Sequence, residues 1–188
     1  KPVFLSQKQI EQYYEGFCNK TIWPLFHYFP QNVIYDKILW ESYEAVNQIF
    51  RDKVLEDYEE GETIWVHDYQ LMLLPGLIRE RIPGAKIGFF LHIPFPSFEI
   101  FRLLPWRTQL LKGLLGADLV GFHTFDYARH FLSASMRLLG LENHLGQITY
   151  DDRVVRVDSF PMGIDYEKYA TASSQKAVKR AISRFNKM

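Results

Sequence analysis

The chain has 188 residues, of which 47% are apolar and 16% aromatic, and its 22 Lys and Arg residues balance its 22 Asp and Glu residues. This composition is typical of a globular domain rather than a disordered chain, and with a net charge of zero the chain has no net electrostatic field that would attract nucleic acid or an anionic membrane surface. A single cysteine, Cys18, excludes an internal disulfide framework and predicts a buried thiol in a cytoplasmic protein, and no apolar run approaches the roughly 18 residues that span a bilayer.

Residues 36–57 are the first segment with clear helical periodicity. Apolar residues recur there at intervals that place them on one face of a helix, and Asp36 is expected to cap its start. These residues are Leu39, Tyr43, Val46, Phe50 and Val54. The polar run at 57–62 ends this helix and leads into an apolar strand predicted at 63–67.

A helix and a second strand follow this first strand. Residues 69–82 show helical spacing until a Pro-Gly pair turns the chain into a strand at 86–92. The two prolines of the IPFP segment at 93–96 cannot donate to a sheet ladder, so the second strand must stop at His92. The segment is therefore predicted to be a strand–helix–strand unit.

The second half of the chain repeats this alternation. The predicted segments are helical residues near 97–116, a strand at 118–122, a helix at 125–139, a strand at 153–161 and a helix at 166–186. Thr124 and Asp165 are placed to cap the two later helices, and Gly140 is placed to end one of them. Because strands alternate with helices, we expect an α/β fold whose mainly parallel sheet has helices on both faces.

Three of the predicted strands end in polar residues, which are Asp68, His92 and His123. In open sheets wound with helices, ligands bind in the crevice outside the carboxyl ends of the strands. The sequence therefore predicts a ligand site at this edge of the sheet.

Each residue near this edge has a specific interpretation. Asp68 either accepts hydrogen bonds from the hydroxyl groups of a ligand such as a sugar, or caps the helix that starts at Tyr69. His92 leaves an apolar strand into a proline-fixed loop, which favours a preorganised contact with a ligand oxygen. His123 either reaches the ligand or anchors the following helix. His67 alternates in side with Asp68 and is interpreted as a structural residue that faces away from the site.

A metal-dependent phosphohydrolase is an alternative that would use the same part of the chain. Its candidate ligands, which carry imidazole or carboxylate groups suited to divalent ions, are His67, Asp68, His92, Asp118 and His123. Metal-binding His-Asp pairs of that kind lie on helices in an all-helical fold, whereas these residues belong to predicted strands. We therefore expect no metal ion at this site.

Aromatic residues are concentrated near the start of the chain, at 13–17 and 22–28. Most of these side chains are expected to pack in the core, although aromatic faces also pack against the apolar faces of sugars. The pattern alone does not select which ring would contact a sugar.

Six motifs occur along the chain: YYEGFCN at 13–19, WPLFHY at 23–28, WVHDYQL at 65–71, GFFLHIPFP at 88–96, GFHTFDYARHFL at 121–132 and PMGID at 161–165. Taken together and in this order, they closely resemble the motifs of the trehalose-6-phosphate synthases. The likeness is far more specific than a single short motif, and the FHT form at 122–124 looks more like the eukaryotic and bifunctional branch of that family.

The resemblance implies a fold and a reaction. The fold would be a glycosyltransferase with two Rossmann-like halves, of which residues 1–165 would form an incomplete N-terminal acceptor domain. Residues 166–188 would be a terminal helix that leads toward the donor domain. The enzyme would retain configuration and move glucose from UDP-glucose to glucose 6-phosphate, with no cofactor and no required metal ion.

The resemblance also assigns roles by motif position. Tyr14 and Trp23 correspond to residues of the acceptor site. Asp68 corresponds to the carboxylate that contacts the acceptor sugar, and His92 to the histidine that faces the donor glucose at the reaction centre. Asp68 and His92 are also candidates from their positions at the ends of predicted strands.

Some parts of the family pattern would lie outside the chain. The glycine-rich loop and an early arginine would precede Lys1, and the arginine-lysine pair and acidic motif of the donor half would follow Met188. The chain, which has no initiator methionine, therefore reads as an excised piece that is expected to be inactive alone. An alternative is that the parent is a catalytically silent regulatory relative that binds a sugar phosphate. A fused phosphatase domain and a homo-oligomer are compatible with either reading.

Overall fold

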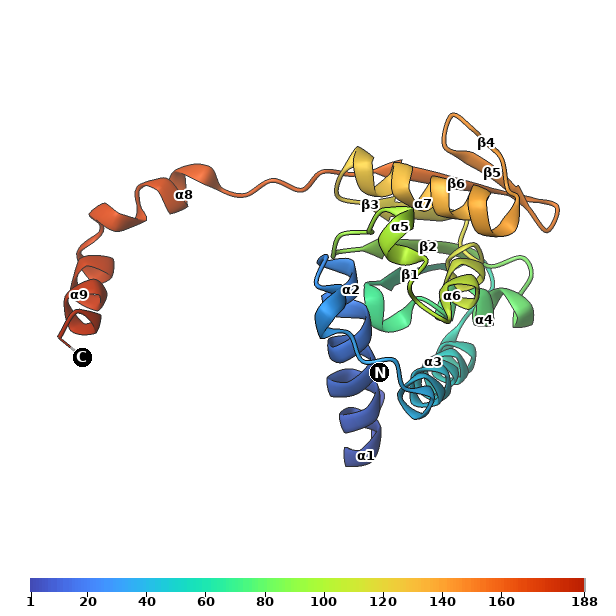
Figure 1. The fold of residues 1–188 in the computed structure, drawn as a ribbon, viewed down its shortest axis with the longest axis horizontal. Helices are drawn as coiled ribbons and strands as arrows, with labels where there is room; N and C mark the ends of the chain where they lie inside the picture. Colours follow the sequence, from blue (N-terminus) through green and yellow to red (C-terminus); the bar gives the residue numbers. More distant parts are fainter. Residues whose placement is uncertain (188) are drawn as a thin grey trace.

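A six-stranded sheet organises the computed structural model, which describes residues 1–187 (Figure 1). Its strands are β1 (Thr63–His67), β2 (Lys86–Leu91), β3 (Leu119–Phe122), β4 (Asn143–His144), β5 (Gln147–Tyr150) and β6 (Arg153–Ser159). They lie in the order β1-β2-β3-β6-β5-β4; β1, β2, β3 and β6 are parallel, and β5 and β4 are antiparallel additions. The predicted α/β class with a mainly parallel sheet is confirmed.

Helices account for most of the remaining chain. They are α1 (Gln7–Gln9), η1 (Ile10–Ile22), α2 (Trp23–Phe26), η2 (Pro30–Asn32), α3 (Lys37–Asp57), η3 (Tyr69–Leu71), α4 (Leu74–Arg81), α5 (Phe98–Phe101), α6 (Arg107–Leu114), α7 (Phe125–Leu139), α8 (Tyr166–Ala170), η4 (Ala172–Ser174) and α9 (Lys176–Phe185). The side chains of Asp36, Thr124 and Asp165 accept backbone hydrogen bonds at the starts of α3, α7 and α8. Gly140 ends α7 with a φ of 69°, so the predicted caps are confirmed.

The helices that connect the parallel strands pack against one face of the sheet. The order β1-β2-β3-β6 advances in a single direction, and right-handed crossovers then place every connecting helix on the same side. Val66, Phe89 and Val120 are paired across the strands on that side and are at most 3% exposed. On the opposite face Trp65 is 62% exposed. In the described residues, the face of β1 that carries Trp65 is therefore open.

A continuous helical segment over residues 7–26 was not evident from the aromatic pattern. Its middle part, η1, has π-type hydrogen bonding, and at its end the amide of Trp23 donates to the carbonyl of Cys18, five residues earlier. A π turn contains more residues than the 3.6 of an α-helix. Its buried side chains, such as Phe17 and Ile22, therefore depart from the spacing that identifies an α-helix.

The β4–β5 hairpin was also not expected. Its two-residue turn consists of Leu145 and Gly146, whose φ angles are both positive, at 48° and 79°. Such turns are usually encoded by Asn-Gly or Asp-Gly, and leucine at the first turn position gives no such signal.

Two predicted helices are shorter than expected. The helix predicted at 69–82 begins only at Leu74, where Pro75 occupies the first turn and needs no amide partner. The helix predicted at 166–186 is interrupted between α8 and α9, because the hydroxyls of Thr171 and Ser174 donate to nearby backbone carbonyls and compete with helical bonding. Figure 1 shows α8 and α9 extending away from the sheet.

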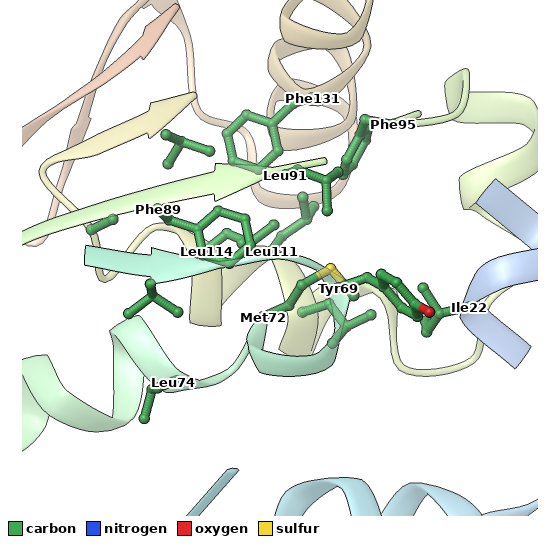
Figure 2. Close-up of a cluster of buried hydrophobic side chains, with 14 of the residues drawn as sticks. Ile22, Tyr69, Met72, Leu74, Phe89, Leu91, Phe95, Leu111, Leu114 and Phe131 are labelled. Carbon is green, nitrogen blue, oxygen red and sulfur yellow. The ribbon is translucent and has the colours of Figure 1, made fainter. Parts of the chain in front are cut away.

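One hydrophobic cluster joins the sheet to its helices. Figure 2 shows Phe89 and Leu91 of β2 together with Leu111 and Leu114 of α6. Cys18 is fully buried, as expected, and burial raises the pKa of its thiol. None of the helices in the described part of the chain is both long and apolar enough to cross a membrane.

Candidate active site

Asp68 adopts a strained backbone conformation immediately after β1. Its φ and ψ angles are 69° and 174°, a region that glycine occupies almost exclusively and that costs other residues about 1–3 kcal/mol. The backbone is held there because the amide of Asp68 donates to the carbonyl of Phe90 at 2.8 Å. A residue kept in such a conformation favours a functional role for its side chain.

The carboxylate of Asp68 bonds to the backbone of the second predicted site residue. Its Oδ1 accepts a hydrogen bond from the amide of His92 at 3.1 Å. The side chain makes no capping bond to the 3₁₀ turn that starts at Tyr69, so the capping interpretation of Asp68 is wrong. A carboxylate has lone pairs for several donors, and Asp68 can therefore still accept from a ligand hydroxyl.

Buried hydroxyl and amide groups hold the segment that follows Asp68. Tyr13 donates to the carbonyl of Gln70 at 3.0 Å, and Tyr43 donates to the carbonyl of Tyr69 at 2.9 Å. The hydroxyl of Tyr43 also accepts from the amide of Met72 at 3.0 Å. Burial raises the pKa of both Tyr13 and Tyr43, so these phenols stay protonated and can donate.

Replacing Tyr43 with Phe is expected to lower the free energy of unfolding by about 1–3 kcal/mol, because two buried backbone groups would lose their partner. Urea titration of the full-length protein, followed by tryptophan fluorescence, measures the change. Tyr166→Phe is the matched control, since Tyr166 is 69% exposed. An equal unfolding midpoint in both variants would show that the hydroxyl of Tyr43 does not hold this segment.

Tyr14 and Trp23 both lie on the N-terminal helical segment, which packs against the residues after Asp68. The ring of Trp23 is 5.6 Å from the ring of Tyr69, and the Tyr69 hydroxyl donates to Oδ1 of Asn19 at 3.0 Å. The pKa of Tyr69 is raised to about 12, mainly by burial and further by the nearby Cys18 and Tyr14. Tyr14 and Trp23 are 46% and 44% exposed, so each retains a free surface that a ligand can meet.

The loop after His92 is anchored at one side chain. Phe95 is fully buried and its ring packs against Phe26, Phe101, Phe122 and Phe131. The ring Nδ1 of His130, on α7, lies 3.0 Å from the carbonyl oxygen of Phe95. The proline-fixed loop is thus tied to α2, α5 and α7, which supports the expected preorganisation of His92. No signal in the sequence identified His130 as the partner of this loop.

His67 does not face away from the site, so that interpretation is wrong. Its Nδ1 lies 3.0 Å from Nε2 of His92, within hydrogen-bond distance. The side chains of a regular strand alternate between its two faces, and this alternation ends at His67. Asp68 has a positive φ, and its side chain points toward β2, where it accepts from the amide of His92. Strand alternation predicted that His67 and Asp68 lie on opposite sides, but both residues contact His92.

His123 is half-buried beside these groups. Its ring centroid lies 5.1 Å from that of Phe90 and 5.7 Å from that of His92. A mostly apolar cavity of about 290 Å³ lies nearby on the open face of the sheet. Its lining includes Trp65, His67, Phe90, His92, Phe160 and Met162.

Asp118 lies at the amino end of β3, opposite the edge that carries Asp68 and His92. Its Oδ1 accepts from Arg79 at 2.8 Å, its Oδ2 accepts from the amide of Ile87 at 2.8 Å, and Arg153 is also close. Asp118 is therefore a structural residue that links the amino ends of β2 and β3. Among residues 1–187, no group of three or more His, Cys, Asp or Glu side chains is arranged to hold a metal ion.

Comparison with known proteins gives a consistent result. The family model described as Glycosyltransferase family 20 matches residues 1–188. A curated relative from Aspergillus fumigatus, named alpha,alpha-trehalose-phosphate synthase (UDP-forming) 1, is 47% identical over 97% of this chain. The chain spans 36% of that relative's length.

Solved structures agree with the sequence comparison. An alpha,alpha-trehalose-phosphate synthase from Burkholderia xenovorans, in complex with glucose-6-phosphate, matches with a TM-score of 0.84 and 31% identity, over 95% of this chain and 41% of its own. The N-terminal domain of a trehalose-6-phosphate phosphatase from Candida albicans matches with a TM-score of 0.82 and 34% identity, over 100% of this chain and 40% of its own.

Proposed function

The chain belongs to glycosyltransferase family 20, and from this membership we propose that it is part of a retaining glucosyltransferase that makes trehalose 6-phosphate. The donor is UDP-glucose and the acceptor is glucose 6-phosphate. The observation that supports this most directly is the bond between the Asp68 carboxylate and the amide of His92, which brings two strand ends together at the edge where ligands bind.

The four site residues have separate proposed roles. Asp68 accepts a hydrogen bond from a hydroxyl of the acceptor sugar, and His92 faces the donor glucose at the reaction centre. Tyr14 and Trp23, which lie on the segment packed beside Asp68, contact the acceptor. This division of roles is supported by the contact of Trp23 with the residue after Asp68.

The proposed reaction is a substitution on the front face of the donor sugar. The bond between glucose C1 and the oxygen of the UDP diphosphate breaks, and a bond between C1 and the acceptor oxygen forms on the same face. The leaving diphosphate takes the proton of the acceptor hydroxyl. Asp68 and His92 orient the sugars and stabilise charge, so neither needs to act as a nucleophile.

This mechanism requires no cofactor and no metal ion bound to the acceptor domain. Imidazole and carboxylate groups could ligate an ion, but among residues 1–187 no group of three or more such side chains is arranged to hold one, and Asp118 is bound by arginines at the other end of the sheet. A cytoplasmic location, a fused phosphatase domain and a homo-oligomer belong to the same proposal. The likeness to the N-terminal domain of a phosphatase supports the second of these.

The proposal predicts that the full-length protein releases UDP from UDP-glucose only when glucose 6-phosphate is present, and does so in the presence of a chelator. The measurement is UDP release with and without the acceptor, in EDTA. No release from a folded protein would favour the catalytically silent alternative. Release only after metal is added would contradict a metal-independent reaction.

A further inference from the structure

A second histidine holds the ring of His92. Nδ1 of His67 is 3.0 Å from Nε2 of His92, and the two rings stack with centroids 5.2 Å apart and 28° between their planes. Since this bond occupies Nε2, the remaining nitrogen, Nδ1, is the one that can meet a ligand oxygen. The side chain of His92 is thus fixed through His67, and its backbone amide through Asp68.

His67 is itself fixed by β1. Trp65, two residues earlier on the same face, stacks on it at 5.7 Å with 11° between the planes. Phe90, its partner in the register with β2, packs its ring 4.8 Å from that of His92. His67 therefore reaches His92 from a regular strand rather than from a loop, which gives the bond a constant geometry.

We propose that His67 is a positioning residue for the glucosyl transfer: by bonding Nε2, it fixes both the ring orientation and the proton position of His92. A neutral imidazole has one donor and one acceptor nitrogen, so the partner at Nε2 determines whether Nδ1 carries the proton. For Nδ1 of His92 to donate to a sugar oxygen, Nε2 must accept, and His67 must donate. This inference rests on the proposed function.

The charge of His67 also bears on the direction of this bond. The pKa of His67 is lowered by burial and then by His92, while Asp68 opposes the shift. His67 therefore stays neutral at neutral pH, and it gains a proton only below the ordinary histidine value of about 6.5. A protonated His67 has two donor nitrogens and no acceptor, so it can still donate to Nε2 of His92 and cannot accept from it. Other titratable groups around the pair are His123 and, on β6, the Asp158–Arg156 ion pair.

The first test measures the proton position of His92 directly. Nitrogen NMR of histidine-labelled full-length protein at neutral pH is expected to show a single tautomer for His92. In His67→Ala we expect averaged signals from both tautomers, and in His67→Asn a single tautomer again, because the asparagine amide can replace Nδ1. Unchanged His92 signals in His67→Ala would overturn the proposal, whether or not the protein transfers glucose.

The second test is kinetic. His67→Ala is expected to lower kcat about tenfold, the size of one lost hydrogen bond, with little change in KM for either substrate. His67→Asn should restore most of kcat, because the asparagine amide can donate to Nε2 of His92 in place of Nδ1 of His67. His144→Ala, a change at an exposed histidine of β4, is the matched control.

Two kinetic results would contradict the proposal. Wild-type kcat in His67→Ala would show that the bond has no effect on turnover. Equal loss of kcat in the Ala and Asn variants would show that turnover does not depend on a hydrogen bond from residue 67. If wild-type protein released no UDP, the proposed function would fail, and the NMR result would still decide whether His67 positions His92.

Discussion

Replacing Asp68 with Asn is expected to lower kcat of the full-length protein about a hundredfold while leaving the fold intact. In the proposed mechanism the Asp68 carboxylate accepts a hydrogen bond from the acceptor sugar, and the change removes its negative charge. A hydrogen bond to a charged group is worth about 1.5–3 kcal/mol. UDP release dependent on glucose 6-phosphate measures the effect. Substrate saturation curves separate it from a change in binding alone.

The fold is expected to survive because asparagine preserves what holds residue 68 in place. Asparagine has nearly the shape of aspartate, so the backbone strain at residue 68 is almost unchanged, and its Oδ1 can still accept from the amide of His92. Asp36→Asn is the matched control, since Asp36 caps α3 and asparagine caps helices equally well. A kcat near the wild-type value in Asp68→Asn would exclude the proposed role of the carboxylate.

The sheet and the two central site residues were predictable because they depend on local signals. β1 and β2 are short apolar runs that end at a polar residue, and the prolines after His92 leave no way to extend the strand. Parallel strands place their carboxyl ends at one edge, so Asp68 and His92 had to be neighbours once the fold class was known. The motif resemblance added the acceptor residues Tyr14 and Trp23, whose roles stay proposals.

The contacts that support these residues were not predictable, because each depends on a backbone detail or a distant partner. His67 was assigned to the wrong side because the positive φ of Asp68 interrupts the alternation of the strand. His130 reaches the loop after His92 from a helix 35 residues later. The hydroxyl of Tyr43 supports the segment after Asp68 from inside α3, where its spacing identified it only as a core residue.

The strain at Asp68 and the anchoring of its surroundings are physically linked. A residue in a glycine-like conformation is kept there only when neighbouring contacts determine the backbone on both sides. At Asp68 itself, the backbone amide donates to the carbonyl of Phe90 on β2. After Asp68, the hydroxyls of Tyr43 and Tyr13 donate to the carbonyls of residues 69 and 70. The free energy of these contacts compensates for the strain, which suggests that the position of the carboxylate matters more than local stability.

Replacing Phe95 with Ala is expected to lower the free energy of unfolding by about 3–5 kcal/mol. Phe95 is fully buried and contacts four other phenylalanine rings, so its removal leaves a cavity that the proline-fixed loop cannot fill by relaxing. Urea titration of the full-length protein measures the change. Phe125→Ala is the matched control, because Phe125 is 72% exposed and is expected to change the unfolding midpoint little.

Phe95→Ala is also expected to lower kcat below the temperature at which the variant unfolds. Phe95 lies three residues after His92, and its ring and its carbonyl tie the loop to the helices, so a loosened loop would let the His92 backbone drift from the Asp68 carboxylate. A destabilised variant with wild-type kcat would show that Phe95 serves stability alone. In that case the bonds of His92 to Asp68 and His67 would be sufficient to hold the imidazole in place without the loop.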